Sequence, residues 1–296
     1  MSELRLNTDG HIIKFGADND VSLTHVADAG LLLNSTMKLQ FNDATQFVQG
    51  TSATVLSIGA TDEIDLTATA VDLNGTLDVS GASQFNGAMV LAGTTPTLTI
   101  GDAGAEDSKI VFDGNAQDFH IGLDDTDDSL KIGLGSTLGT TAHIIADASG
   151  AVTMPLNPGY VAHVTTQIDN VTGDETNYTI QMSADIVDRG ADNAHATGIF
   201  TAPVVGLYNF SCALSLGGIA SDHTRLILTG TSSNRNYTVK TLLIDDIDSS
   251  GSLGINASMT VDMDASDTFF WTLRIDGGSK VVDLQDTSRI SGFLIG

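Results

Sequence analysis

Apolar residues recur along most of the chain at every second position, in short runs that are broken by Gly, Asn, Asp and Ser. Near the C-terminus, for example, Phe269, Trp271, Leu273 and Ile275 alternate with other residues. A period of two places successive side chains on opposite faces of a β-strand, whereas a helical face repeats about every 3.6 residues. No segment has a convincing helical period. The pattern therefore predicts an all-β chain.

Aromatic residues make up 5% of the chain and concentrate in its C-terminal part. The late aromatics are Phe200, Tyr208, Phe210, Phe269, Phe270, Trp271 and Phe293. The sequence Asn157-Pro158-Gly159 is typical of a turn or linker, so we place a domain boundary there. Residues 158–296 contain period-two strands in GLYNFSCALSL, ASMTVDMD and TFFWTLRI, separated by turn-rich segments. We expect this region, the head, to be a β-sandwich of the jelly-roll type.

Residues 1–94 differ in composition and pattern, because short apolar units are separated by small polar residues. The alternating apolar positions include Ile64, Leu66, Val71, Leu73, Leu77 and Val79. One chain with so little apolar surface cannot form a core, but three copies wound together would pool their apolar edges and pair their strand edges. We therefore expect an elongated, intertwined, trimeric β shaft in which each layer contacts mainly its neighbours.

Residues 95–157 are predicted to form a small β module. Turn sequences occur at Gly101-Asp102, Asp113-Gly114-Asn115 and Asp124-Asp125, and these residue types suit hairpin loops. The intervening strands hold Ile110, Phe112, Phe119, Ile121, Leu130 and Ile132. We expect antiparallel hairpins or a small sheet, also associated around a three-fold axis.

The net charge is −25, from 12 basic and 37 acidic residues, and no Lys or Arg occurs between Lys38 and Lys109. A field of that sign opposes phosphate neutralisation, so nucleic acid is not an expected partner. No apolar run approaches the roughly 20 residues that a spanning helix needs, so membrane insertion is not expected. The N-terminus does not open like a signal peptide, which predicts assembly in a cytoplasm.

The sequence contains no recognisable catalytic motif. The single cysteine, Cys212, alternates with apolar residues and is interpreted as a small buried side chain. Seven histidines are scattered with no two within four positions, so there is no local zinc pair. A phosphate-binding glycine loop, a Gly-x-Ser-x-Gly elbow and a His-Glu-x-x-His motif are all lacking from the sequence. We expect a protein that is not an enzyme and that needs no cofactor.

An acidic run offers the best candidate for a metal site. Its members are Asp124, Asp125, Asp127 and Asp128. Calcium requires several oxygen ligands converging from one loop, although the spacing lacks the glutamate of an EF-hand. A solvated turn is the favoured interpretation, because charge runs usually face water. A second candidate of the same kind is formed by Asp245, Asp246 and Asp248.

Three segments of the head match a known family in order: GIFTAPVVGLYNFSCAL, DASDTFFWTLRI and SRISGFLIG. At these residues the chain resembles the globular head of the complement q-component and tumour necrosis factor superfamily. The resemblance implies a trimeric jelly roll of two packed sheets. It also implies that Phe200, Tyr208, Phe210, Phe269, Trp271 and Phe293 belong to the core or the trimer contacts of the head. Ile290 stands where the family usually has an aromatic residue.

The first half resembles other proteins, the fibre and structural proteins of tailed phages of marine bacteria. The resemblance lies in IIKFGADNDVSLTHVADAGLLL, in LQFNDATQFVQGTSATVLSIGATDEIDLTATAVDLNGTLDVSG and in DAGAEDSKIVFDGNAQDFHIGLDD. It implies a virion structural protein, a homotrimeric fibre or spike on the tail or capsid. The N-terminal region would bind other virion proteins, and the head would contact a bacterial surface glycan or protein. A collagen-like Gly-X-Y stalk, which an animal complement protein would carry, is absent.

Receptor-binding residues are expected in loops of the head, where basic and planar polar side chains would hydrogen-bond an acidic glycan. The candidates are Arg189, His195, His223, Arg225, Asn234 and Arg235. Two other functions remain open. The chain would be a polysaccharide-degrading tailspike if carboxylates such as Asp62, Glu63 and Asp65 cleaved glycosides, or a purely structural decoration protein with no receptor.

Overall fold

The computed structural model describes residues 7–233, 235–244 and 251–296, and no helix occurs among them. The prediction of an all-β chain is confirmed. The chain divides into two compact units, Met1–Val90 and Leu91–Gly296. In the described ranges we find no helix long and apolar enough to span a membrane.

The first unit contains two small antiparallel sheets, each of three strands. The first sheet consists of β1 (Ile12–Phe15), β2 (Val21–Val26) and β3 (Gly30–Leu33), and the second of β4 (Lys38–Phe41), β5 (Asp43–Ser52) and β6 (Val55–Gly59). The Asn34 side chain ties the first sheet together, accepting from the Ser22 amide at 2.6 Å and donating to the Asp20 carbonyl at 2.9 Å. No residue that is described between positions 7 and 90 is buried. This unit therefore has no core within one chain.

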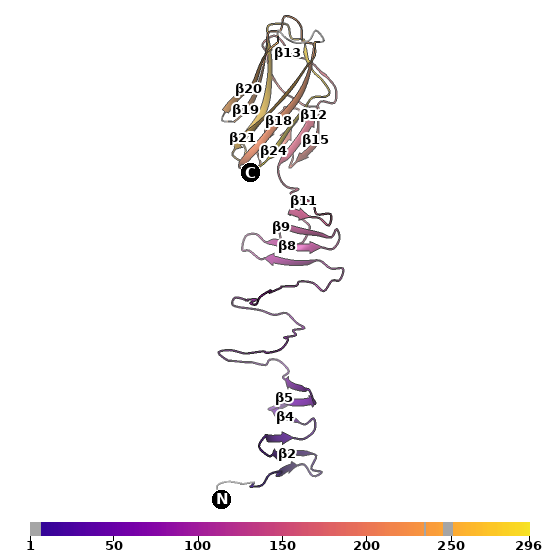
Figure 1. The fold of residues 1–296 in the computed structure, drawn as a ribbon, viewed down its shortest axis with the longest axis vertical. Helices are drawn as coiled ribbons and strands as arrows, with labels where there is room; N and C mark the ends of the chain where they lie inside the picture. Colours follow the sequence, from indigo (N-terminus) through magenta and orange to yellow (C-terminus); the bar gives the residue numbers. More distant parts are fainter. Residues whose placement is uncertain (1–6, 234, 245–250) are drawn as a thin grey trace. The chain divides into compact units, whose positions relative to one another are not determined.

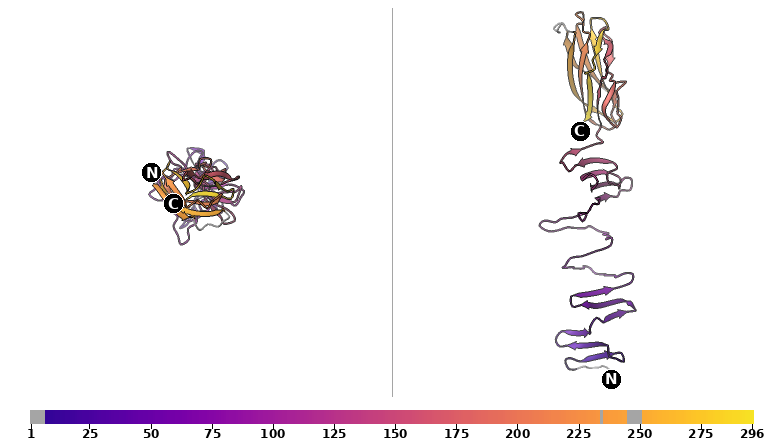
Figure 2. Two further views of the ribbon diagram at one scale, coloured as in Figure 1. Left: turned by 90° about the horizontal axis from the view of Figure 1, so that it is seen from above. Right: turned by 90° about the vertical axis from the view of Figure 1, so that its right-hand side faces the viewer.

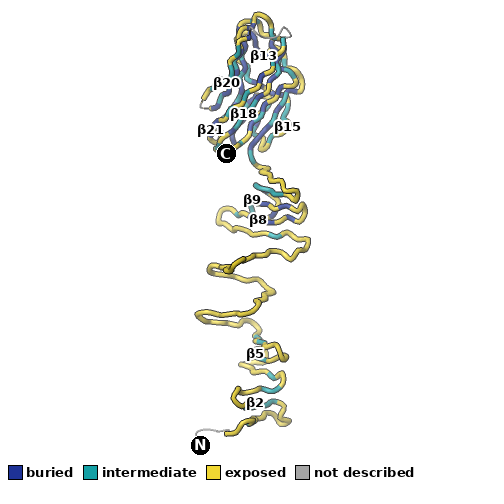
Figure 3. Tube along the Cα trace, viewed as in Figure 1, coloured by how far each residue is buried: buried dark blue, intermediate teal, exposed yellow. Residues whose placement is uncertain are grey.

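Residues 60–107, which we call the strand-free segment, contain no strand, and every one of them is exposed. The segment appears yellow throughout in the burial view (Figure 3). Its residues are all described, and no backbone-to-backbone hydrogen bond joins them to one another or to other residues. Its exposed apolar side chains include Ile64, Leu66, Val71, Leu73, Leu77, Val79, Phe85, Val90, Leu98 and Ile100. One chain alone thus leaves the apolar side chains of this segment exposed and its backbone without a backbone partner.

A small antiparallel sheet of five strands follows, in the order β11-β10-β9-β8-β7. Its strands are β7 (Ser108–Phe112), β8 (Phe119–Asp124), β9 (Ser129–Leu134), β10 (Ala142–Ala146) and β11 (Val152–Thr153). The order follows the chain strand by strand, so each connection is a hairpin, as the sequence predicts. The β8–β9 hairpin closes through Asp128, whose positive φ of 53° is tolerated by aspartate better than by most residues.

The head is a sandwich of two sheets that lie face to face (Figures 1 and 2). The first sheet contains β12 (Gly159–His163), β13 (Ile168–Thr172), β15 (Ala184–Arg189), β18 (Gly206–Gly217), β21 (Leu253–Met263), β23 (Val282–Leu284) and β24 (Arg289–Leu294). The second contains β14 (Asn177–Thr179), β16 (Asn193–Ala194), β17 (Ile199–Thr201), β19 (Arg225–Ser232), β20 (Arg235–Leu243) and β22 (Thr268–Asp276).

Successive neighbours are β12-β24-β18-β21 in one sheet of the head and β17-β22-β19-β20 in the other. The chain crosses repeatedly between the sheets, and its last strand returns beside its first. All these pairings are antiparallel. This arrangement is that of an eight-stranded jelly roll, which confirms the fold class predicted for the head.

An aromatic cluster forms the centre of the head. The rings of Phe210 and Phe269, one from each sheet, stack with centroids 3.8 Å apart, and Trp271 meets Phe269 edge-on at 5.2 Å. Gly292 lies against this cluster, because a Cβ there would be 2.6 Å from ring atoms of Phe210 and Tyr160. The core residues predicted from the sequence that are buried here are Phe200, Tyr208, Phe210, Phe269 and Trp271.

Phe293 is the exception, because its side chain lies outside the core and is 41% exposed. It alternates along β24 with Ile290 and Gly292, which face inward, so strand parity places it on the outer face of the sheet. Cys212 is buried among the core residues, as expected, and burial raises the pKa of its thiol to about 12.

Candidate functional site

At one end of the head, two arginines share one carboxylate. Arg225, at the start of β19, donates from Nε and Nη2 to Asp276 Oδ2 at 2.8 and 2.5 Å. Arg274, on the neighbouring strand β22, donates from Nε to Asp276 Oδ1 at 2.5 Å. Arg274 also reaches Glu175 Oε2 at 3.2 Å. The two guanidinium groups therefore already have two carboxylate partners from this chain.

The carboxylate of Asp276 is almost completely buried. Burial alone would raise its pKa, but hydrogen bonds from Arg274 and Arg225 together outweigh that effect, and the pKa lies below its ordinary value. The sequence did not single out Arg274 as a functional residue. The direct pairing of Arg225 with Asp276 across β19 and β22 depends on strand register, which no local motif encodes.

His223 is not an exposed receptor contact as predicted, because its side chain is buried. Its Nδ1 accepts from the Ala220 amide at 2.9 Å, and its Nε2 lies 3.1 Å from the Ser279 carbonyl oxygen. Both ring nitrogens are used to hold two loops together, and Gly278 packs directly on the ring. The role that the structure supports for His223 is structural.

His195 is partly exposed and belongs to a polar cluster around Asp185. Its Nδ1 lies 2.5 Å from Asp185 Oδ2, and Asn193 Nδ2 donates to the other oxygen of the same carboxylate at 2.7 Å. Asp188 accepts from the amides of Asp192 and Asn193. The pKa of Asp192 is raised, first by burial and then by the neighbouring charge of Asp188.

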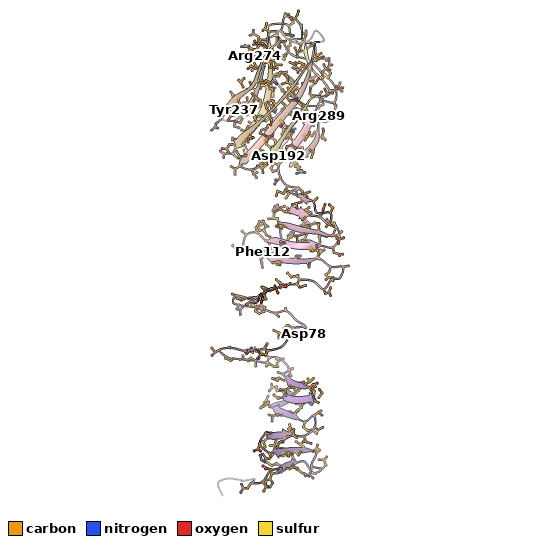
Figure 4. All side chains as sticks on the ribbon, viewed as in Figure 1. Asp78, Phe112, Asp192, Tyr237, Arg274 and Arg289 are labelled. Atoms are coloured by element: carbon orange, nitrogen blue, oxygen red, sulfur yellow. The ribbon has the colours of Figure 1, made fainter. Side chains whose placement is uncertain are left out.

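The remaining candidates lie on the surface with few partners among the described residues. Arg189 ends β15 and donates from Nη1 to the Met154 carbonyl oxygen at 3.4 Å. Arg235 begins β20, and its Nη1 lies 3.5 Å from the hydroxyl of Tyr237, which Figure 4 labels. Asn234 lies outside the described residues, as do the acidic residues 245, 246 and 248.

The predicted receptor residues do not form one site. Arg225 pairs with Leu243 at one end of the β19–β20 hairpin, and Arg235 pairs with Ser232 at the other. The register continues from Ser232 through β22 and β17 to Asn193, so the His195 cluster shares the end at which Arg235 lies. Figure 4 likewise shows Arg274 and Asp192 towards opposite ends of the head.

The acidic run between β8 and β9 is organised around an ammonium group. Lys131 Nζ contacts Asp124 Oδ2 at 2.6 Å and Asp127 Oδ2 at 2.8 Å. The second oxygens of both carboxylates accept hydrogen bonds from Thr126 and Ser129. Lys131 lowers the pKa of Asp124 and of Asp127, and these two carboxylates raise its own pKa.

This arrangement differs from the calcium site considered for Asp124, Asp125, Asp127 and Asp128. Lys131 supplies the positive charge, and Asp125 and Asp128 are exposed without joining the cluster. Across the residues with a described position, no group of three or more His, Cys, Asp or Glu side chains is arranged to hold a metal ion. The lysine comes seven residues after Asp124, on the facing strand, which is why the acidic run by itself gave no sign of it.

We predict that Lys131→Met loosens the β8–β9 hairpin at neutral pH, because it leaves a largely buried carboxylate without its counter-ion. The lowered pKa values of Asp124 and Asp127 mean that their stabilisation is present above about pH 4, the usual unfolded value, and is lost as pH falls through the folded values. Amide hydrogen exchange of β8 and β9 should therefore be faster in the variant at pH 7, with the difference shrinking below about pH 4.

Lys109→Met is the matched control for this prediction. It removes the same side chain from the neighbouring strand β7, where the ammonium group contacts only the exposed carbonyl oxygen of Ser136 among the bonds described for it. Equal exchange in wild type and Lys131→Met at pH 7 would contradict the assigned role of Lys131.

Neither protein-family models nor curated proteins gave a match to the sequence. Among solved structures, the chain is similar to the globular domain of zebrafish complement 1qA protein, with 20% identity over 47% of this chain and 98% of that domain, at a TM-score of 0.35. It is also similar to murine APRIL, with 7% identity over 47% of this chain and 99% of APRIL, at a TM-score of 0.34. The jelly-roll assignment rests on the strand order of the head itself.

Proposed function

We propose that this chain is one subunit of a homotrimeric fibre or spike on a bacteriophage particle, and that its head attaches to the bacterial surface. The main support for a trimer comes from the strand-free segment. The backbone of residues 60–107 makes no backbone-to-backbone hydrogen bond within the chain, and its apolar side chains are exposed. Extended copies of the same chain supply both kinds of partner at once.

The outer face of the first head sheet supports the same proposal. Its central strands β18, β21 and β24 carry mostly small uncharged side chains there, around a shallow hollow of about 550 Å³. The lining includes Ser211, Ala213, Asn256, Ser258 and Ser291, and one charged side chain, Arg289. Phe293 lies on the same face and is exposed. In a chain of net charge −25, a nearly neutral face lets identical copies approach without mutual repulsion.

Attachment is proposed from the phage-fibre resemblance of the first half together with the polar groups of the head. The Arg225–Arg274 pair and the His195 cluster occupy different ends of the head, so a trimer would present three copies of each. Threefold repetition converts weak individual contacts into strong attachment. In this proposal the N-terminal region binds other proteins of the particle, the protein is located on the virion, and it is not an enzyme.

The proposal is tested with the purified full-length protein and cells of the bacterium that the phage infects. The labelled protein should sediment as a trimer, bind these cells saturably, and reduce phage adsorption at least tenfold at saturating concentration. A matched sample unfolded by heating serves as the control. Absence of binding, with adsorption unchanged, would remove the attachment function.

Two further experiments distinguish the alternatives, a polysaccharide-degrading tailspike and a purely structural decoration protein. Release of reducing sugars from host polysaccharide would establish a tailspike enzyme instead, although Asp62, Glu63 and Asp65 are exposed residues of the strand-free segment. Normal adsorption by particles that lack the head would favour a purely structural decoration protein.

A further inference from the structure

The small sheet β7–β11 has its polar side covered and its apolar side open. One face carries His120, Asp124, Ser129 and Lys131, all of them buried. The opposite face carries Ile110, Phe112, Phe119, Leu123, Leu130 and Ile132, all of them at least 37% exposed. A soluble sheet with one wet face normally has the reverse arrangement, with apolar side chains inward and polar ones outward.

The polar face is closed by the chain itself, through the loop at residues 135–141. His120 Nδ1 lies 2.9 Å from the Gly135 carbonyl oxygen, which ties the start of this loop to β8. A Cβ on Gly139 would lie 2.8 Å from Asp124 Oδ2, so this loop rests directly on the buried carboxylate. No second cover is therefore needed on this side.

The apolar face is ordered by register into a row of isoleucines. Ile110 pairs with Ile121, Ile121 with Ile132, and Ile132 with Ile144, so four strands place the same residue side by side. Phe112, which Figure 4 labels, pairs with Phe119 in the next row and is 59% exposed. Contiguous apolar faces of this kind are rarely left in water by soluble proteins and mark contact surfaces.

We infer that this isoleucine face is a trimer interface, at which three copies of the sheet pack against one another. The inference rests on the proposed homotrimer and names the surface that one part of it uses. Three features identify the occupant as this same chain. The face carries no charged side chain in a chain of net charge −25, so copies meet there without repulsion.

The second feature is symmetry. The row presents an isoleucine on each of four strands, so copies related by a three-fold axis along the row would meet with the same side chain at each strand. The third is continuity. The strand-free segment leads directly into β7, and its exposed Leu98 and Ile100 need partners from other chains for the same reason as Ile110. A single three-fold contact thus extends from Leu98 and Ile100 into the sheet, and the polar face with its loop turns outward.

The test uses two variants that each introduce one cysteine on β7. Ile110 and Val111 are adjacent and similarly exposed in one chain, at 40% and 36%, but they point to opposite faces. The introduced cysteine of Ile110→Cys should react with a maleimide at least tenfold more slowly than that of Val111→Cys in the full-length protein. In denaturant, where Cys212 reacts equally in both variants, the two rates should become equal. The native Cys212 stays silent under native conditions, because it is buried and burial raises its pKa to about 12.

A short bismaleimide should also link copies of Ile110→Cys into covalent dimers, and should not link Val111→Cys. Leu130→Cys repeats the test from another strand of the same face, in case the first variant assembles poorly. Equal native labelling of the two β7 variants in a protein that sediments as a trimer would overturn this inference and leave the proposed homotrimer intact. Equal labelling in a monomer would remove both. Protection of Ile110→Cys without covalent dimers would also overturn the inference, because another segment would then be the cover.

Discussion

Phe269→Ala is expected to lower the free energy of unfolding of the head by about 3–5 kcal/mol, whereas Phe270→Ala should lower it by less than about 1 kcal/mol. The two residues are neighbours on β22, so the substitutions remove the same atoms from opposite faces of one strand. Phe269 is fully buried, stacked on Phe210 and in edge contact with Trp271. Its removal leaves a cavity at the junction of the two sheets, while Phe270 lies partly exposed on the outer face.

Trp271 provides the measurement, because it is the only tryptophan in the chain and is buried in the same cluster. Its fluorescence during denaturant unfolding reports on the head specifically. All proteins are compared at one concentration, since association would add to the apparent stability. Equal losses from the two substitutions would mean that the strand parity assigned to β22 is wrong.

The combined substitution Leu73→Asp and Leu77→Asp is expected to prevent assembly. Both side chains are exposed in one chain but would be enclosed between copies in the proposed trimer. Burying an unpaired carboxylate costs several kcal/mol, and each 1.4 kcal/mol is a factor of ten in affinity, so association should weaken by at least ~10³-fold. Sedimentation of the full-length protein should show monomers, while Trp271 fluorescence reports a head that is still folded.

Asn74→Asp combined with Thr76→Asp is the matched control for assembly. It adds the same two charges at two positions that lie between the leucines in sequence and already carry polar side chains. This variant should remain a trimer, or lose far less affinity. If the leucine variant also sediments as a trimer, the strand-free segment does not hold the copies together, and another region must.

Several features of the fold were predictable because they are local. Alternation at Phe269, Trp271, Leu273 and Ile275 sets which side chains share a face, and the structure buries all four. The hairpins of β7–β11 follow from turn residues between short apolar runs. Phe293 was assigned to the core or trimer contacts of the head from a family resemblance, and in one chain it is exposed. Its neighbours Ile290 and Gly292 take the inward positions of β24.

The candidate sites were less predictable, because they depend on contacts between residues far apart in sequence. The acidic run is typical of a calcium loop until Lys131 is brought across from β9. His223 has the residue type of a binding group, yet two backbone partners in the interior occupy its ring. Arg225 shares Asp276 with Arg274 through the register of β19 and β22.

The all-β class, the strands of the head and the low apolar content of the first half follow from periodicity and composition, because these are properties of short stretches of chain. Which polar groups are neutralised within the chain, and which apolar faces have no cover, emerges only when the strands pack together. Those outcomes depend on register and loop placement. The isoleucine row shows the difference, since each isoleucine is visible in the sequence, but only the pairing of four strands makes them one open surface.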